Sequence, residues 1–214
     1  VVVDMVLPIG SIASIVGYEG PHNIVTITDM PAEGATPNFF RDVLPDLKLW
    51  RFNLLSGSPD PDSSNHLKAA HIGDIISVLK ESYDYVLIDI GRSLSRITMP
   101  FILHADLNIL VVSTDISTVS ITKTVLDYMR GKGVSADSVF TILNRAVGLE
   151  GLSKSDAEKV LEIPIKAAVP YLGSNMSLAN SQHQPFSLKF PTDTASIVFQ
   201  EAAKEMSNLA RNLR

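Results

Sequence analysis

Short apolar runs that end in a polar residue are the clearest pattern along this chain. Val1–Val3 is followed by Asp4, and Tyr85–Ile88 is followed by Asp89. Four consecutive apolar residues at Tyr85–Ile88 fit a strand buried on both faces, as in the centre of a parallel sheet. Further strands are expected at Lys48–Leu54, Leu107–Val112, Val139–Leu143 and Ile165–Val169.

Apolar residues three and four positions apart predict helices between these strands. The segment Asn65–Glu81 has such a face, and the last helix has another after Asp193, a residue suited to capping it. Other helices are expected at Ser11–Val16, at Leu94–Leu103 with a kink or early end at Pro100, after Ser117, and at Ser153–Leu161. The segments expected to be irregular are Ala32–Pro37, Ser56–Asp62 and Tyr171–Pro191, whereas His22–Met30 fits a strand or a helix.

This alternation of strand and helix predicts an α/β fold, with three α/β/α layers and a mostly parallel sheet. A chain of 214 residues that is 45% hydrophobic suits one core, so a single domain over residues 1–214 is expected. The first expected strand begins at Val1 without a lead-in. We therefore expect the beginning of the domain to lie before Val1.

Composition excludes several classes of function. The chain has no cysteine, which rules out disulfides and thiolate metal sites and suits a reducing cytoplasm. Its apolar runs are far shorter than a transmembrane segment. A net charge of −5 with scattered Lys and Arg gives no strong nucleic-acid signal, and the five histidines show no metal-ligand spacing.

Polar groups follow the ends of several expected strands. They are Asp4, Asp89, Ser113–Asp115 and Asn144–Arg145. Because the carboxyl ends of parallel strands share one edge of a sheet, these groups should converge on one crevice. Asp89 in such a place can hold hydrated Mg²⁺ beside a nucleotide phosphate, and the alternative is that it caps the next helix.

Motifs that would define the chemistry directly are absent from these 214 residues. No Gly-x-x-x-x-Gly-Lys-Ser/Thr phosphate loop occurs, and Gly131–Gly133 lacks its spacing. No Gly-x-Gly-x-x-Gly follows Asp4, and no Gly-x-Ser-x-Gly elbow is present. A dinucleotide-binding fold and a serine hydrolase are therefore disfavoured.

Several segments together resemble one family. They are Tyr83–Asp89, Arg92–Leu94, Leu143–Arg145, Ile163–Pro170, Ala179–Asn180 and Gln184–Pro185. Their order and spacing resemble the ParA/MinD branch of P-loop ATPases, and most closely the CpaE/TadZ-type pilus-assembly proteins. The resemblance implies a P-loop NTPase-like fold whose first strand, lysine-bearing phosphate loop and first helix would lie before Val1.

The same resemblance implies a nucleotide site. ATP and Mg²⁺ would be the cofactors of the complete family domain, and Asp89 would hold the water shell of the metal. The nucleotide-side residues would be Asp4 in support of the metal, Asn144 at the base, Arg145 steadying that loop, Pro170 and Asn180. Val6 stands where the family has a second acid, so weak or absent hydrolysis is expected, and Gly91 stands where a proline is common.

Three functions follow from these observations. The first is a nucleotide-dependent switch or localisation factor that forms a homodimer and recruits a pilus or secretion machine, at the inner membrane or cell pole. The second is a scaffold with the same fold that acts by protein contact alone. The third is a ParA-like DNA-partitioning ATPase, which the acidic net charge disfavours.

Overall fold

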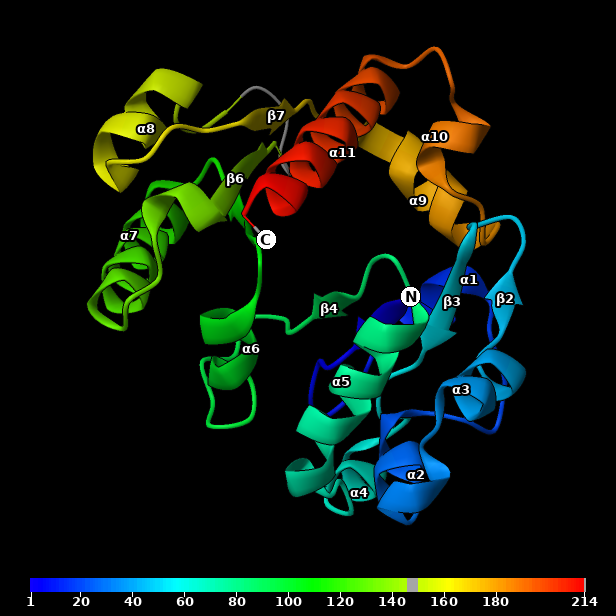
Figure 1. The fold of residues 1–214 in the computed structure, drawn as a ribbon. Helices are drawn as coiled ribbons and strands as arrows, with labels where there is room; N and C mark the ends of the chain where they lie inside the picture. The colour runs from blue at the N-terminus through cyan, green and yellow to red at the C-terminus, as the bar shows by residue number, and fades with distance from the viewer. Residues whose placement is uncertain (146–149, 214) are drawn as a thin grey trace. The chain divides into compact units, whose positions relative to one another are not determined.

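A computed structural model describes residues 1–145 and 150–213 of the chain, as Figure 1 shows. The chain divides into two compact units, and each is described by itself. Unit 1 comprises Val1–Thr98 and Asn180–Pro185, and unit 2 comprises Met99–Ala179 and Phe186–Arg214. The expected single domain stays a prediction.

Unit 1 alternates short strands with short helices. Its strands are β1 (Val2–Asp4), β2 (Asp46–Leu47), β3 (Phe52–Leu55) and β4 (Leu87–Asp89). Its α-helices are α1 (Ile12–Val16), α2 (Ile24–Asp29), α3 (Pro37–Val43), α4 (Pro61–Ser64) and α5 (Ile72–Ser82), with 3-10 helices at Ala32–Gly34 and Ala69–His71.

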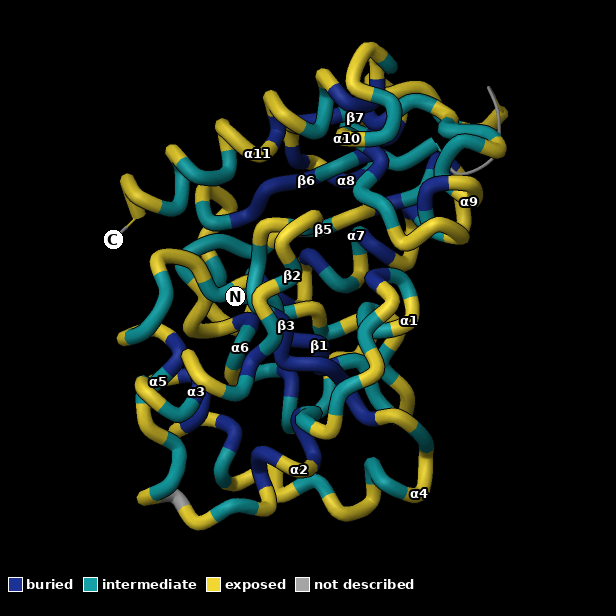
Figure 2. Tube along the Cα trace, turned by 90° about the vertical axis from the view of Figure 1, so that its right-hand side faces the viewer, coloured by how far each residue is buried: buried dark blue, intermediate teal, exposed yellow. Residues whose placement is uncertain are grey.

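Within the described residues, the sheet of unit 1 has the order β2-β3-β1-β4. β1 is parallel to both β3 and β4, and β2 is antiparallel to β3. Val3 pairs with Leu55 on one side and with Ile88 on the other. Val3 and Leu55 are fully buried, and Figure 2 shows the β1 trace as buried. β1 is therefore the strand around which this unit is built.

Unit 2 has the longer elements. Its strands are β5 (Asn108–Ser113), β6 (Val139–Asn144) and β7 (Ala167–Val169). Its α-helices are α6 (Met99–His104), α7 (Ile116–Gly131), α8 (Lys154–Leu161), α9 (Gly173–Ser181, whose last two residues belong to unit 1), α10 (Phe186–Lys189) and α11 (Thr194–Asn212), with a 3-10 helix at Ala136–Ser138.

In the described part of unit 2, β5, β6 and β7 form one parallel sheet in that order. Phe140 and Ala167 form a buried cluster with Ala202 of α11, and Val198 and Met206 of the same helix pack against it. The face that the spacing predicted for the last helix is thus the face that covers the sheet. The prediction of an α/β fold with mostly parallel strands is confirmed.

The expectation that Tyr85–Ile88 forms a strand buried on both faces is wrong. β4 begins only at Leu87 and, among the described residues, pairs with β1 alone. Leu87 is 50% exposed and Tyr85 is 39% exposed. The physical reason is that, among the described residues, β4 is the edge strand of its sheet and has a neighbouring strand on one side alone.

Prolines account for helices that the sequence did not predict. Thr36 caps α3 and Asp60 caps α4, and in each case a proline follows in the first helical turn. Proline is well suited to that position because it has no N–H to leave unsatisfied and its φ is already helical. Pro100 likewise lies in the first turn of α6, which therefore begins at Met99 and not at Leu94.

Other boundaries also differ from the expectations. Lys48–Arg51 forms a turn between β2 and β3, so the alternation at Lys48–Leu54 belongs to a hairpin and not to one strand. α5 begins at Ile72, later than expected, because a 3-10 turn precedes it. His22–Met30 contains helix α2, and Tyr171–Pro191 contains α9 and α10. None of the helices in residues 1–145 and 150–213 has the length and hydrophobicity needed to cross a membrane.

Candidate functional site

The carboxyl ends of β1 and β4 bring two of the predicted site residues together. Asp4 and Asp89 are register partners in the parallel pair formed by these strands. The Met5 N–H continues this pairing by donating to the Asp89 carbonyl at 2.7 Å. Two residues 85 positions apart in the sequence therefore lie side by side at one edge of the unit 1 sheet, which we call rim 1.

Asp4 is fully buried, and both of its carboxylate oxygens accept backbone hydrogen bonds. The Val6 N–H donates to Oδ1 at 3.1 Å, and the Ile12 N–H donates to Oδ2 at 3.0 Å. A buried carboxylate is tolerated only where such donors replace water. Asp4 thus fixes the turn after β1 and the first residue of α1, and it offers no exposed oxygen to a ligand.

Two glycines make the close packing around Asp4 feasible. A Cβ on Gly10 would lie 2.6 Å from Oδ2 of Asp4 and 2.7 Å from the Cα of Gly57. A Cβ on Gly57 would lie 2.7 Å from the Cα of Gly10. The Gly10 N–H also donates to the Ser58 carbonyl at 2.9 Å. The loops after β1 and β3 therefore touch backbone to backbone over the buried carboxylate.

Asp89 differs from Asp4 because its side chain is exposed. Its Oδ1 accepts the Gly91 N–H at 2.9 Å. Gly91 has φ of +60°, a left-handed conformation that glycine adopts readily and proline cannot adopt. Val6 lies next to Gly91, since a Cβ there would come within 3.3 Å of a Val6 methyl. An apolar side chain therefore borders the exposed carboxylate.

The carboxyl ends of the unit 2 strands form a second edge, which we call rim 2. Ser113, Asn144 and Val169 are register partners across β5, β6 and β7. The Arg145 N–H donates to the Val169 carbonyl at 3.1 Å, and Pro170 follows directly. The predicted residues Asn144, Arg145 and Pro170 thus lie together, and the groups that the strand ends offer are amides and hydroxyls.

Thr114 organises rim 2, a role that the sequence did not reveal. Its hydroxyl donates to the Glu150 carbonyl at 3.1 Å, and its own carbonyl accepts the Leu152 N–H at 2.7 Å. The neighbouring Asp115 caps α7 by accepting the Thr118 N–H at 3.0 Å. Thr114 is only 3% exposed. The signal available in the sequence was a threonine close after an expected strand.

Asn180, the remaining predicted site residue, lies in the segment Asn180–Pro185 of unit 1. It is half-buried, and its carbonyl accepts the His183 N–H at 3.0 Å. Asn180 therefore groups with the unit that holds Asp4 and Asp89, while Asn144, Arg145 and Pro170 group within the other. The convergence of Asp4, Asp89, Ser113–Asp115 and Asn144–Arg145 on one crevice stays a prediction.

Rim 1 can contribute one carboxylate to a cation. Within residues 1–145 and 150–213, no cluster of three or more His, Cys, Asp or Glu side chains could hold a metal ion. The exposed Asp89 fits a hydrated divalent cation, which takes one or two protein carboxylates and completes its shell with water and phosphate oxygens. Asp4 suits a supporting role at such a site, because its hydrogen bonds to Val6 and Ile12 hold the adjacent loop in place.

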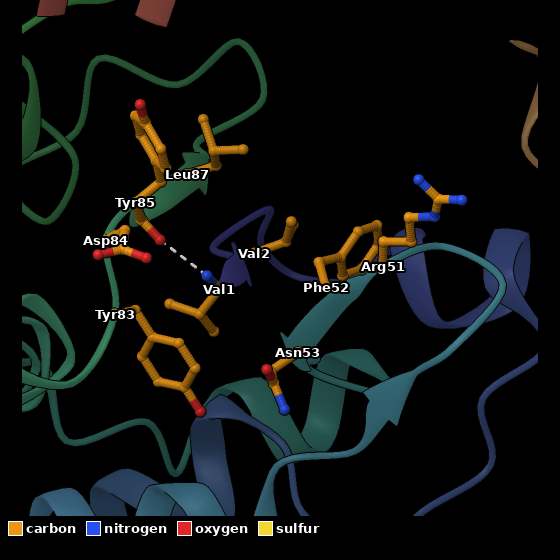
Figure 3. A pocket seen from close by; sticks show the side chains of 9 residues that line it. All are labelled: Val1, Val2, Arg51, Phe52, Asn53, Tyr83, Asp84, Tyr85 and Leu87. Atoms are coloured by element: carbon orange, nitrogen blue, oxygen red, sulfur yellow. Dashed lines mark hydrogen bonds between the residues drawn. The ribbon is translucent and has the colours of Figure 1, made fainter.

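A pocket of about 410 Å³ lies at the opposite end of the unit 1 strands, as Figure 3 shows. Val1 and Val2, Phe52 and Leu87 line it at the amino ends of β1, β3 and β4. Within the part of the chain that the structure describes, the buried Tyr83 hydroxyl has no hydrogen-bond partner, and burial raises the pKa of this tyrosine. Ligands of open α/β sheets bind at carboxyl ends, so this pocket is not the candidate site.

Comparison with known proteins gives a match in fold but not in sequence. No family model matches the chain, and no curated protein matches its sequence. Among solved structures, it is similar to a ParA family ATPase from Chlorobium tepidum, with a TM-score of 0.82, 18% identity, and coverage of 94% of this chain and 84% of the other.

Two MinD structures are similar to the chain as well. MinD from Pyrococcus horikoshii, complexed with Mg-ADP, gives a TM-score of 0.81 and 21% identity over 100% of this chain and 85% of the other. The MinC:MinD cell division protein complex from Aquifex aeolicus gives a TM-score of 0.69 and 18% identity, over 96% of this chain and 82% of the other. The chain therefore has a ParA/MinD-type, P-loop-like fold.

Proposed function

We propose that this chain is the core of a ParA/MinD-like, nucleotide-dependent switch with weak or absent hydrolysis. The observation that carries the proposal is the pairing of Asp4 with Asp89 at the carboxyl end of adjacent parallel strands in this fold. Such an edge is where α/β sheets of this kind bind ligands. The Mg-ADP complex of the Pyrococcus horikoshii MinD supports the choice of nucleotide.

The proposed roles follow from burial and position. Asp89 is exposed and would hold the water shell of Mg²⁺, which would screen the phosphate charge. Asp4 is buried and would keep the neighbouring loop in place. Rim 2 would serve the uncharged part of the nucleotide, with Asn144 at the base, Arg145 steadying its loop and Pro170 beside it; Asn180 would contact the base side from its own segment.

The donors for the phosphates would come from residues outside these 214, because no phosphate loop occurs within them. The open strand edges support this part of the proposal. In the described residues, β4 pairs only with β1, and β5 pairs only with β6. Leu87 is 50% exposed, Ile109 is 42% exposed and Val111 is 59% exposed. Apolar strand edges are normally covered, and a strand followed by a phosphate loop and a helix would cover such an edge.

A finer role in pilus or secretion-machine assembly rests on the sequence likeness to CpaE/TadZ-type proteins. The segments Tyr83–Asp89 and Leu143–Arg145 carry that likeness. In this role the chain would dimerise around the nucleotide and recruit a protein partner in the cytoplasm, at the inner membrane or cell pole. The complex of the Aquifex aeolicus MinD with MinC is consistent with partner-dependent action by this fold.

A scaffold without nucleotide chemistry is the second candidate, and Val6 favours it. The family has an acid at this position, whereas here two methyl groups border Gly91 on rim 1. An apolar group cannot orient a water molecule for attack on a phosphate. DNA partitioning is a weaker third candidate, because a net charge of −5 opposes binding to a polyanion.

Titration calorimetry with Mg²⁺ and ATP tests the proposal. The protein should be prepared together with the residues that its gene encodes before Val1, if these include a glycine-rich loop with lysine. Asp89→Asn keeps the acceptor for the Gly91 N–H but removes the charge, and should weaken Mg-ATP binding about ten-fold or more. Asp42→Asn, at an exposed position on α3, is the matched control and should bind normally.

The outcomes separate the candidates. Binding that depends on Asp89 but not on Asp42 supports the switch. No binding by protein that contains the loop, with retained folding, contradicts the switch and favours the scaffold. Absence of any phosphate-loop sequence in the gene would do the same.

A further inference from the structure

The loop that follows β4 carries a second exposed charge, which the roles proposed above leave unused. Arg92 comes directly after Gly91 and is exposed, as is Asp89 at the end of the strand. Residues 89–98 all belong to unit 1. The loop and rim 1 therefore lie within one compact unit.

The guanidinium of Arg92 is unpaired. In the part of the chain that the structure describes, it makes no ion pair and no hydrogen bond, although Asp89 is only three residues away. Asp89 accepts the Gly91 N–H at 2.9 Å instead. The two opposite charges do not neutralise each other, so both remain available to a ligand.

Chain geometry keeps Arg92 close to whatever Asp89 binds. Three residues of fully extended chain span at most about 11 Å. The hydrogen bond from the Gly91 N–H to Asp89 and the left-handed backbone of Gly91 turn the chain here and shorten that distance. An arginine side chain is long enough to cover much of what is left. A group held at Asp89 is therefore within reach of the guanidinium.

Hydrogen bonds also fix the next part of the loop. The Thr98 hydroxyl donates to the Ser93 carbonyl at 2.8 Å and accepts the Ser95 N–H at 2.9 Å. Thr98 is only 2% exposed, so these bonds lie at a buried point. Arg92 thus lies between two fixed points, the turn at Gly91 and the Ser93 carbonyl. A backbone that is already fixed loses less entropy when its side chain binds a ligand.

A carboxylate and a guanidinium held apart suit a ligand that carries a cation and an anion together. In a magnesium nucleotide triphosphate the metal bridges the last two phosphates, and the planar guanidinium fork matches phosphate oxygens. The group beside a metal at Asp89 is then the terminal phosphoryl group, which a diphosphate lacks.

We propose that Arg92 binds the terminal phosphoryl group of the magnesium nucleotide at rim 1 and makes this site selective for a triphosphate over a diphosphate. The inference rests on the proposed function. It adds one phosphate donor from within this chain to the donors expected outside these 214 residues.

Titration calorimetry with Mg-ATP and with Mg-ADP, on the protein prepared as above, tests the inference. Arg92→Gln should weaken ATP binding about ten-fold or more and ADP binding less than about three-fold. Arg51→Gln is the matched control, because Arg51 is also exposed and, within the described residues, unpaired, but lies just before β3 at the amino end of the same sheet. This control should change either affinity by less than about two-fold.

Two further measurements sharpen the test. Magnesium tripolyphosphate has the phosphate chain without a base, and Arg92→Gln should weaken its binding by the same factor as that of ATP. Arg92→Lys keeps the charge but lacks the planar fork, so it should recover only part of the ATP affinity. This variant also keeps the test decisive if Arg92→Gln folds poorly, which circular dichroism would show.

The outcomes separate this inference from the proposed function. ATP binding that depends on Asp89 but is unchanged in Arg92→Gln and Arg92→Lys would overturn the role of Arg92 and leave the switch standing. Equal losses for ATP and ADP would also overturn it. So would an equal loss in Arg51→Gln, which marks general electrostatic attraction. No Mg-ATP binding by the unaltered protein would overturn both proposals.

Discussion

The two rims occupy equivalent places at the carboxyl ends of parallel strands, yet they are built differently. Rim 1 has a fully buried carboxylate, Asp4, with backbone donors on both oxygens and an exposed carboxylate, Asp89, beside it. At the strand ends of rim 2, Ser113 and Asn144 supply a hydroxyl and an amide, and a neutral threonine, Thr114, holds the loop. One edge is organised around charge and the other around neutral hydrogen bonds.

This difference bears on what each edge could bind. A rigid edge with one exposed carboxylate suits a cation and the charged end of a ligand. An edge of amides and carbonyls suits the polar but uncharged end, where hydrogen bonds give specificity. Each rim therefore suits a different kind of ligand group.

The largest effect is expected at Asp4. Asp4→Ala removes the acceptor from the N–H groups of Val6 and Ile12 and should lower the free energy of unfolding by about 2 to 4 kcal/mol. Urea denaturation followed by Trp50 fluorescence, which reports unit 1, measures this loss. Asp4→Asn keeps one acceptor oxygen and should lower the free energy of unfolding by less. A loss below about 1 kcal/mol for Asp4→Ala would show that rim 1 is not organised by this carboxylate.

The next largest effect is expected at the close contact between Gly10 and Gly57. Gly57→Ala places a methyl group 2.7 Å from the Cα of Gly10 and should destabilise unit 1 by about 1 to 3 kcal/mol through overpacking. Gly73→Ala is the control, because a Cβ there meets nothing within 4 Å, and it should stabilise by about 0.5 to 1 kcal/mol. Equal stabilities of the two variants would contradict the close approach of the loops.

The equivalent change in rim 2 should be smaller. Thr114→Val keeps the shape of the side chain and removes its hydrogen bond to the Glu150 carbonyl, so it should cost about 1 kcal/mol. Denaturation followed by circular dichroism measures this loss of stability. Trp50 fluorescence would not report it, because Trp50 lies in the other unit. A cost as large as that of Asp4→Ala would remove the contrast between the rims.

The smallest effect concerns pH and lies at Asp60, which caps α4 in the loop after β3. The Ser63 hydroxyl and then its N–H, bound at 2.6 and 2.7 Å, lower the pKa of Asp60 below its ordinary value. A carboxyl whose pKa is lower in the folded state stabilises above its unfolded pKa and loses this contribution as the pH falls through the folded value. Asp60→Asn should therefore flatten the acid limb of stability below about pH 4. An unchanged limb would contradict this assignment.

The sequence predicted much of the fold because apolar spacing reports which face is covered. The long helices α7 and α11 and the strand β6 follow from that spacing. Pro37 and Pro61 were interpreted as breakers, although each begins a helix, because capping depends on the residue before the proline. The prediction that β4 is buried on both faces was wrong, because the pattern of a strand does not say which neighbours are present.

For the site, strand ends could be predicted but their local packing could not. The pairing of Asp4 with Asp89 follows from parallel topology. The burial of Asp4 and the contact between Gly10 and Gly57 depend on how two loops fold back, which no short motif encodes. The left-handed backbone of Gly91 likewise depends on the local loop and could not be predicted from a motif.

Paramagnetic broadening by Mn²⁺ with ATP, followed by NMR on the backbone amides of the protein, tests the central claim most directly. The account predicts that the amides of Met5 and Gly91, beside Asp4 and Asp89, broaden first, and that Asp89→Asn abolishes the effect. Broadening that spares both amides, or that persists in Asp89→Asn, would contradict a cation site at rim 1.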